Sequence, residues 1–379
     1  MTRSTEALVA HSLGADPEFT PVTLDNLQPT EALVEVHATG ICHTDIACIE
    51  GKLPAQFPNV LGHEGGGVVL EVGSAVKDVK KGDKVLLSYN FCGDCSHCTE
   101  GHPAYCESMI PLNFGGKRLD GTQTVSLAKD PSTPVFANFF GQSTFSRIAL
   151  VSGSSLVRVP DSTPLELFAP LGCGLQTGAG SIFKSLNVKP RSKVAIFGAG
   201  CVGLSAVMAA KIRGAAMIIA VDIQPDRLEM ARELGATHLI NGKDKDLLQQ
   251  IQDLCKPGKG VDYALDCSGV LSVIETMIQS LGMRGRATSA GAPAPGQRVA
   301  VDVFSHLVSG REYVGCHQGG SVAAEMIPFL IEQHNQGKYP LERLIRYYNV
   351  KDAQQAFQDM KGGKVLKPVL VWSESSLQN

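Results

Sequence analysis

The spacing of apolar residues in the first part of the chain predicts short strands. Runs rich in valine and leucine, separated by turn glycines, occupy residues 31–38, 67–72 and 83–87. No helix of comparable length is predicted between them, and runs of this kind are typical of strands. This part of the chain is therefore predicted to be mostly β.

Farther along the chain, apolar strands alternate with segments of helical length. The predicted strands lie at residues 194–197, 217–221, 261–267 and 286–290. This alternation predicts a doubly wound parallel sheet. The fold class is therefore α/β, with a parallel-sheet domain and a mostly β domain.

Residues 194–210 carry no charge over about the length of a membrane span, but their glycines favour another structure. The strand at 194–197 leads into Gly198, Gly200 and Gly203, which form the pattern G-x-G-x-x-G before an apolar helix. The first glycine makes the turn, the second lets the backbone approach a pyrophosphate, and the third lets the helix pack on the strand. With exposed N–H groups at the helix start, the pattern predicts a dinucleotide site.

An acidic residue stands where such a site needs one. Asp222 ends the next predicted strand, about twenty residues further on. Its carboxylate can accept hydrogen bonds from both ribose hydroxyls and would repel a 2′-phosphate, so NAD is predicted over NADP. Arg227 lies within reach of the same ribose and could soften this discrimination, or it could be a solvated arginine on a helix face.

Four cysteines, separated by two gaps of two residues and one of seven, lie in a short segment: Cys92, Cys95, Cys98 and Cys106. The spacing is typical of a closed structural zinc site, which leaves no position open for water. The alternative, a pair of disulfides, needs an oxidising compartment. Residues 1–19 lack the apolar core of a secretory signal, so zinc and a cytoplasmic location are predicted.

Length and charge narrow the class of protein. The chain has 379 residues, more than a single core comfortably serves, and 44% of them are hydrophobic, as in ordinary globular proteins. The net charge of −3 provides no basic surface for nucleic acid, and no membrane anchor is predicted. A small molecule is therefore the expected substrate.

A second group of possible metal ligands is spread along the chain. Cys42, His63 and Cys173 each lie beside glycines, where a strand is predicted to end or a helix to begin. Two thiolates and one imidazole leave the fourth tetrahedral position of a zinc ion open, which is the pattern of a catalytic site. Taken singly, each could instead be a buried cysteine or a hydrogen-bonded core histidine.

Together these features resemble the zinc-dependent medium-chain alcohol dehydrogenases along nearly the whole chain. The motifs follow the family's order: GICHTD, GHEGGGVVLEVG, GDKV, the four-cysteine segment, GCGLQTGAG, FGAGCVG and AVDI. HTD and the segments ESMIPLNFGGKRLDGT and FFGQSTF are most similar to the aryl-alcohol (benzyl-alcohol) dehydrogenase branch. The resemblance implies a Rossmann cofactor domain and a GroES-like catalytic domain.

The resemblance also implies roles for the residues around the catalytic zinc, which Cys42, His63 and Cys173 would bind. Asp45 would orient His63, and Glu64 is the family's carboxylate near the metal. Thr44 matches the hydroxyl that accepts the substrate's proton. The family's relay histidine, five residues after the first zinc cysteine in liver-type members, is replaced by Ala47, so His43 or water would finish the relay.

Contacts to the cofactor and substrate are implied in the same way. His43 and Lys367 match positions at the pyrophosphate, and Thr177 and Val202 match positions at the nicotinamide. The substrate channel is expected to be wide and to suit an aromatic or allylic ring, with its wall formed by Leu53, Ser88, Phe139, Ala292 and His317. His317 and Gln318 could contact an oxygenated ring or form hydrogen bonds at a subunit interface.

The predicted domains are residues 1–175 for catalysis, with the zinc lobe at about 90–110, 176–317 for NAD, and 318–379 as a return to the catalytic domain. The long loop between Cys106 and Phe139 resembles that of dimeric members, so a homodimer is predicted through residues 301–314, with a tetramer as the alternative.

The predicted reaction interconverts a primary aromatic or allylic alcohol and its aldehyde with NAD(H). Alternatives are a glutathione-adduct formaldehyde dehydrogenase and a biosynthetic aldehyde or ketone reductase of the same family. A zinc-free quinone reductase would lack both ligand sets, and an inactive NAD-binding relative would be expected to lose a ligand or Thr44; this chain keeps them all.

Overall fold

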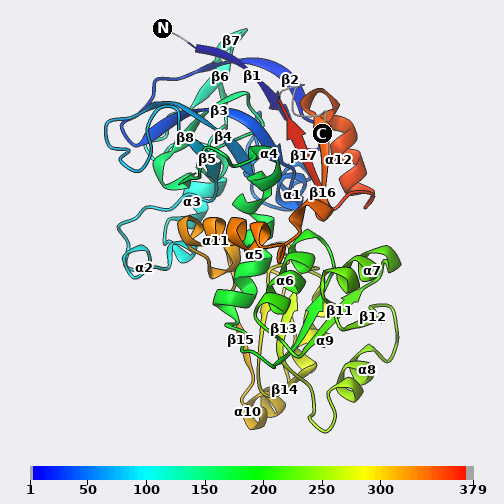
Figure 1. Ribbon diagram of the computed structural model, residues 1–379. Helices are drawn as coiled ribbons and strands as arrows, with labels where there is room; N and C mark the ends of the chain where they lie inside the picture. The colour runs from blue at the N-terminus through cyan, green and yellow to red at the C-terminus, as the bar shows by residue number, and fades with distance from the viewer. Residues whose placement is uncertain (1–2, 373–379) are drawn as a thin grey trace. The chain divides into compact units, whose positions relative to one another are not determined.

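The computed structural model describes residues 3–372, and the chain forms two compact units (Figure 1). The first contains the chain up to Cys173, Val322–Ile331 and the chain from Leu341 onward; the second contains Gly174–Ser321 and Glu332–Pro340. The sequence predicted residues 174–175, 318–321 and 332–340 as part of the catalytic domain, but they lie with the second unit. There the buried Tyr339 hydroxyl is 2.6 Å from the Ser205 hydroxyl.

The first unit is mostly β, as predicted. Its larger sheet has the strand order β16-β17-β3-β4-β5-β9, with β8 also paired to β3. The bounds are β3 Glu31–Gly40, β4 Gly65–Val72, β5 Lys84–Leu87, β8 Ile148–Ser152, β9 Leu156–Arg158, β16 Ile345–Asn349 and β17 Lys367–Val371. A second sheet has the order β1-β2-β6-β7, with β1 Arg3–Val9, β2 Glu18–Leu24, β6 Val125–Leu127 and β7 Asp130–Val135.

The helices that begin in the first unit are either short or lie toward the end of the chain. They are α1 His43–Ile49, α2 Ser96–Thr99, α3 Met109–Phe114, α4 Leu165–Phe168, α11 Ala323–Asn335 and α12 Ala353–Lys361. Valines and leucines from the inner face of the large sheet form the core, including Val34, Val69 and Val85. The strand ends that leave this core carry the residues of the candidate metal centre.

The second unit is a parallel sheet with the strand order β12-β11-β10-β13-β14-β15. The bounds are β10 Lys193–Phe197, β11 Met217–Asp222, β12 His238–Asn241, β13 Val261–Asp266, β14 Leu281–Ser289 and β15 Glu312–Val314. In chain order the strands are arranged 3-2-1-4-5-6, which is the doubly wound dinucleotide-binding topology. The predicted Rossmann fold is confirmed.

Helix α5 Gly174–Gly180 precedes the first of these strands. The helices between the strands are α6 Cys201–Ile212, α7 Pro225–Leu234, α8 Leu247–Leu254, α9 Leu271–Gln279 and α10 Val303–Ser309. The central strand β10 is almost wholly buried, which explains its continuous apolar run. β14 begins five residues before the predicted start at 286, because Leu281 pairs with Val261 before an irregularity in the register. Within residues 3–372, no helix is both long and apolar enough to cross a membrane.

Candidate metal and cofactor sites

Three segments of the first unit converge on one point. Cys42 immediately precedes α1, His63 lies two residues before β4, and Cys173 follows a short 3₁₀ turn, Ala169–Gly172. One ligand atom from each residue lies within 4.8 Å of the other two. His63 and Cys173 are buried and Cys42 is partly buried. The separations suit a tetrahedral ion with metal–ligand bonds of about 2.0–2.3 Å.

Asp45 organises the region around His63. Its Oδ2 accepts a hydrogen bond from the Cys42 N–H at 2.9 Å, and its Oδ1 accepts one from the Gly62 N–H at 3.1 Å. The same Oδ1 lies 3.0 Å from Nδ1 of His63, which is the contact expected from the sequence. All of the Asp45 side chain is buried. The carboxylate therefore ties together the backbone beside two ligands and the ring of one.

The electrostatics of His63 fit a metal. Burial is the largest single influence and acts to lower the pKa of His63, but the contributions of Asp45 and Cys42 together raise this pKa to about 10, so the site favours positive charge. Nδ1 faces Asp45, while the buried Nε2 has no hydrogen-bond partner. An orphaned buried nitrogen is costly, and coordination of a cation would satisfy it.

The two thiols beside His63 shift each other's pKa in opposite directions. A hydrogen bond with Cys173 lowers the pKa of Cys42, and the same hydrogen bond raises the pKa of Cys173. One sulfur is thus stabilised as a thiolate at the expense of the other. A divalent cation would take both as thiolates, so the donor set fits zinc.

Glu64 follows the histidine and forms a buried ion pair. Nζ of Lys367 donates to both Glu64 carboxylate oxygens at 2.9 and 2.8 Å, and to the Ile41 carbonyl at 3.1 Å. Burial raises the pKa of Glu64 to about 7, although the Lys367 ammonium acts to lower it. The sequence analysis placed Lys367 at a pyrophosphate and did not foresee this pair, because its partners are 303 residues apart.

The four-cysteine lobe brings its sulfurs together as predicted. Sγ of Cys92 lies 3.4 Å from that of Cys106 and 3.9 Å from that of Cys98, and all four thiols are unpaired. A disulfide needs about 2.05 Å, whereas these separations suit four thiolates around one ion. Backbone N–H groups of Glu107 and Cys98 lower the pKa of Cys95 to about 6, and burial raises that of Cys98 to about 12.

The glycine loop of the second unit has the geometry that its pattern predicts. Gly198 has a φ of +96°, and a Cβ on Gly203 would lie 1.8 Å from the Gly198 carbonyl oxygen. A Cβ on Gly200, the residue that precedes α6, would meet nothing within 4 Å. The first and third glycines are therefore required by the fold. The second leaves open space at the helix N-terminus, where a phosphate could lie.

Asp222 lies directly beside this loop. One carboxylate oxygen accepts a hydrogen bond from the Ala199 N–H at 2.6 Å and the other accepts one from the Gln224 N–H at 2.9 Å. Val202 lies in the first turn of α6, and the partly buried Arg227 lies on α7. The acidic side chain at the end of β11 therefore lies next to the open space at the start of α6.

Comparison with known proteins identifies the family. Residues 28–161 match the model of the alcohol dehydrogenase GroES-like domain, and residues 201–332 match that of the zinc-binding dehydrogenases. Geraniol dehydrogenase of Castellaniella defragrans is 38% identical over 371 residues, which cover 97% of this chain and 98% of that protein. The chain belongs to the zinc-dependent alcohol dehydrogenase family.

Solved structures of this alcohol dehydrogenase family agree in fold. An alcohol dehydrogenase zinc-binding domain protein from Burkholderia ambifaria has a TM-score of 0.95 at 44% identity, with 99% of this chain and 100% of that chain covered. Benzyl alcohol dehydrogenase of Acinetobacter calcoaceticus has a TM-score of 0.93 at 38% identity, with 98% and 100% covered. The predicted resemblance to the family and to its aryl-alcohol branch is therefore confirmed.

Other relatives within the family carry a different name. S-(hydroxymethyl)glutathione dehydrogenase of Paracoccus denitrificans is 32% identical over 377 residues, covering 97% of this chain and 100% of that protein. Membership of the family therefore establishes an alcohol dehydrogenase without choosing among its substrates.

The predicted channel residues of this alcohol dehydrogenase differ in their surroundings. In the first unit, Phe139 is buried with its ring edge-on to His63 at 5.3 Å, and Leu53 is partly buried. Ser88 is only 1% exposed, and its hydroxyl donates to the Gly172 carbonyl at 2.7 Å. The Ser88 hydroxyl is thus engaged within the protein, next to a metal ligand.

In the second unit, Ala292 is exposed and His317 is partly buried. Gln318 is buried, and its Oε1 lies 3.4 Å from the Thr177 hydroxyl, which donates to it. This contact within one unit was not among the roles expected for Gln318. The hydrogen bond joins Gln318 to Thr177, which is predicted to lie at the nicotinamide.

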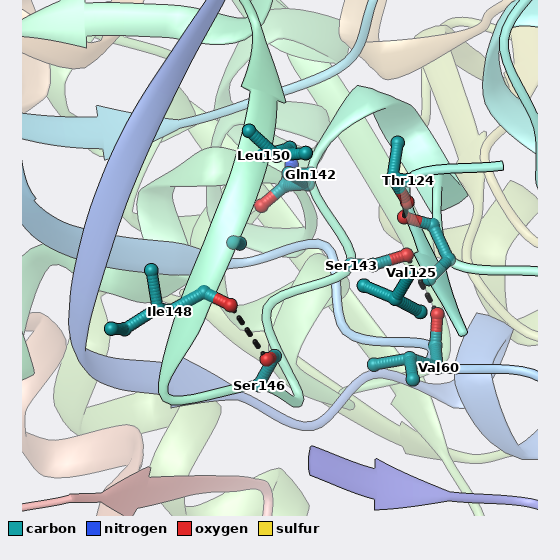
Figure 2. Close-up of a pocket in the computed structure, with 10 residues that line it drawn as sticks. Val60, Thr124, Val125, Gln142, Ser143, Ser146, Ile148 and Leu150 are labelled. Carbon is teal, nitrogen blue, oxygen red and sulfur yellow. Dashed lines mark hydrogen bonds between the residues drawn. The ribbon is translucent and has the colours of Figure 1, made fainter. Parts of the chain in front are cut away.

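The first unit contains a small cavity of about 10 Å³ (Figure 2). Gln142, Ser143, Ser146 and Thr124 line it, together with apolar side chains such as Val60 and Leu150. The volume is enough for about one water molecule, so it cannot be a substrate site. Figure 2 shows the Ser143 hydroxyl directed at the Val60 carbonyl, a hydrogen bond of 2.7 Å.

Proposed function

We propose that this protein interconverts a primary aromatic or allylic alcohol and its aldehyde with NAD(H), using one catalytic and one structural zinc ion per subunit. The observation that carries the proposal is the buried group of Cys42, His63 and Cys173, in which Nε2 of His63 lacks a partner. Three protein ligands leave a fourth position for an alcohol or aldehyde oxygen, whereas the four-cysteine lobe has no open position.

Bound zinc would supply a Lewis acid, and bound NAD would accept the hydride. Asp45 holds His63 with Nε2 free, through the contact to Nδ1. Thr44, in the first turn of α1, is partly buried and in contact with Cys42, its hydroxyl 3.7 Å from the sulfur. We assign Thr44 as the first acceptor of the alcohol proton.

The exposed His43 is next in the proposed path of that proton. Ala47, one turn further along α1, has no group that titrates. His43 is therefore proposed to pass the proton to solvent, directly or through water, and also to contact the cofactor pyrophosphate. Lys367 is left out of this contact, because its buried ammonium donates to Glu64 and Ile41.

The proposed substrate class rests on the apolar residues of the channel and on the names of two relatives, geraniol and benzyl alcohol dehydrogenase. Leu53 and Phe139 of the first unit are proposed to form the apolar wall. An aromatic ring buries about 100 Å² more apolar surface than an ethyl group, worth about 2.5 kcal/mol before ordering costs at about 25 cal/mol per Å². This favours benzyl alcohol or geraniol over ethanol by about ten- to hundred-fold in kcat/KM.

NAD is proposed as the cofactor because Asp222 would face a 2′-phosphate. Its proposed contacts are the glycine loop for the pyrophosphate, Asp222 for the adenosine ribose, and Thr177 and Val202 for the nicotinamide. Replacing Asp222 by Ser would remove the repulsion and improve relative use of NADP by about 1–3 kcal/mol. If the unmodified enzyme already prefers NADPH, Arg227 determines the choice of cofactor, and the assignment of NAD from Asp222 is wrong.

A homodimer is proposed through the edge of the parallel sheet. β15 is its terminal strand, and α10 exposes Val303, Phe304 and Leu307 to at least 73%. Exposed apolar residues beside an edge strand indicate a surface that a second subunit covers. A cytoplasmic location is proposed as well. Light scattering should give twice the chain mass, and Phe304→Asp should lower the measured mass toward that of the monomer. If the variant keeps the mass of the unmodified protein, the interface lies elsewhere. A mass four times that of the chain would favour the tetramer.

The deciding assay measures kcat/KM for benzyl alcohol, geraniol, ethanol and S-(hydroxymethyl)glutathione, each with NAD and NADP. We expect the aromatic and allylic alcohols with NAD to give the highest values. A strong preference for the glutathione adduct would favour the glutathione-dependent alternative, which relatives of 32–34% identity support by name. Equal values for ethanol and benzyl alcohol would contradict the proposed channel.

A further inference from the structure

The segment that contributes Phe139 has an unusual backbone. We call residues 139–144 the 139–144 loop. In this loop, Phe140 has a φ of 53°, Gly141 of 65° and Ser143 of 47°. Residues with a Cβ rarely adopt this left-handed region because it costs free energy, and they persist there only where the surroundings hold them.

Hydrogen bonds around the loop hold this conformation. The Ser143 hydroxyl accepts from the Phe139 N–H at 2.8 Å and donates to the Val60 carbonyl at 2.7 Å. The Thr144 N–H donates to the Gly62 carbonyl at 2.9 Å. The loop is therefore fastened to the backbone immediately before His63.

Aromatic side chains of the loop enclose the His63 ring. The Phe140 ring is stacked on it, with centroids 4.6 Å apart and planes 26° apart. The Phe139 ring meets it edge-on at 87°. These contacts restrict rotation of the imidazole about its own axis, in addition to the hydrogen bond with Asp45 at Nδ1.

Gln142 connects the backbone at His63 to the backbone at Ser88. Its buried Nε2 donates to the His63 carbonyl at 3.1 Å and to the Ser88 carbonyl at 2.8 Å, and its Oε1 accepts from the Gly65 N–H at 3.3 Å. The Ser88 hydroxyl in turn donates to the carbonyl of Gly172, the residue before Cys173. A continuous path of hydrogen bonds thus runs from His63 to the segment of Cys173.

We propose that Gln142 and Ser88 are positioning residues that set the separation of His63 and Cys173. The inference rests on the proposed catalytic zinc. Neither side chain is a ligand, but each fixes the backbone that carries one, and a metal site loses affinity when its supporting contacts are removed. The strained loop is then explained, because only its conformation directs the Gln142 amide to both carbonyls and Phe140 to the imidazole.

The test uses the full-length protein with cobalt(II) in place of zinc. The difference between the spectra of unmodified protein and Cys42→Ala isolates cobalt at the three-ligand site from cobalt in the lobe. Gln142→Met keeps the length of the side chain and removes its three hydrogen bonds, and Ser88→Ala removes only the hydroxyl. Thr124→Val is the matched control, since its buried hydroxyl donates to the Ala137 carbonyl at 2.6 Å.

We expect Gln142→Met to change the cobalt absorption bands and to speed cobalt loss to a chelator by about 10- to 100-fold, the range for removing a supporting contact. Ser88→Ala should change the bands and the rate of cobalt loss in the same direction, but by less. The double variant should speed cobalt loss by less than the product of the two single effects, because both substitutions interrupt the same path of hydrogen bonds. Thr124→Val should lower the melting temperature while leaving bands and cobalt loss unchanged.

Two results separate the inference from the proposed function. If Gln142→Met and Ser88→Ala lower the melting temperature as Thr124→Val does, with unchanged bands and release, the two residues are purely structural. If Gln142→Met fails to fold, Ser88→Ala alone decides by the same readouts. If unmodified protein and Cys42→Ala give identical spectra, no metal binds at the three-ligand site and the proposed function itself is wrong.

Discussion

The two groups of metal-ligating residues are built in opposite ways. The central group consists of Cys42, His63 and Cys173, and its first and last members are 131 residues apart in the chain (173 minus 42). Asp45, Gln142 and the rings around His63 hold it in place. The lobe cysteines lie within one stretch of 15 residues, counting 92 through 106, and are mostly part-exposed.

The difference shows what each site depends on. In the lobe, the N–H groups of Cys92 and Cys95 donate to sulfurs at 3.4 Å, and backbone hydrogen bonds such as that from the Thr99 N–H to the Cys95 carbonyl join residues close together in the chain. Bringing four thiols together without a cation is unfavourable, so the metal would supply much of the lobe's order. In the centre, the fold supplies the order, and the metal would add chemistry. The following predictions test that contrast.

Cys42→Ala should have the largest effect. It should remove one of two zinc ions and lower kcat/KM by at least about 10³-fold, on the order of 4 kcal/mol, because Lewis-acid stabilisation is lost. Metal analysis and circular dichroism should show one remaining zinc and an intact fold. Loss of both metals in equal measure would contradict the division between the two sites.

A matched pair of glycines should separate a packed centre from an open lobe. Gly62 and Gly93 have φ values of +85° and +82°, so alanine at either costs about 1–2 kcal/mol. A Cβ on Gly62 would also lie 2.6 Å from the Phe145 nitrogen, whereas one on Gly93 would meet nothing within 4 Å. Chemical denaturation should show a loss of about 3 kcal/mol or more for Gly62→Ala and clearly less for Gly93→Ala. Equal losses would show that the two regions are equally adaptable.

Asp45→Asn should weaken the central metal without unfolding the protein. Removing the charge beside Nδ1 of His63 should lower zinc affinity there by about 10- to 100-fold, measured by competition with a chelator. Asp94→Asn, close to Cys92 in the lobe, is the control and should change zinc affinity far less, because three of the four lobe cysteines are part-exposed. A comparable loss in the control would mean that supporting carboxylates matter equally in both sites.

Cys98→Ala should have the smallest effect on catalysis. It should remove the lobe metal and expose residues 92–106 to proteolysis, while kcat/KM falls by less than about tenfold, since the lobe cysteines form a group separate from the three-ligand group. Limited proteolysis and metal analysis test this together. If activity falls as far as in Cys42→Ala, the lobe is not merely structural.

The sequence alone determined the features whose partners are near in the chain or whose residue types are rare. The four-cysteine spacing, the glycine loop and Asp222 each specify a local geometry, because the turn, the strand end and the ligands lie within one or two elements. The two kinds of domain followed from the short apolar runs in the first part of the chain and from the alternation of strands with segments of helical length farther along.

Only the tertiary structure decided the contacts that support the centre. The Glu64–Lys367 pair spans 303 residues, and the bond from Gln142 to the His63 carbonyl spans 79. Ser88 was predicted to widen a substrate channel, yet its hydroxyl donates to the Gly172 carbonyl. A backbone carbonyl is present at every residue, so a bond to it leaves no signal in residue type or spacing. Which carbonyl lies within reach depends on how strands distant in the chain are paired.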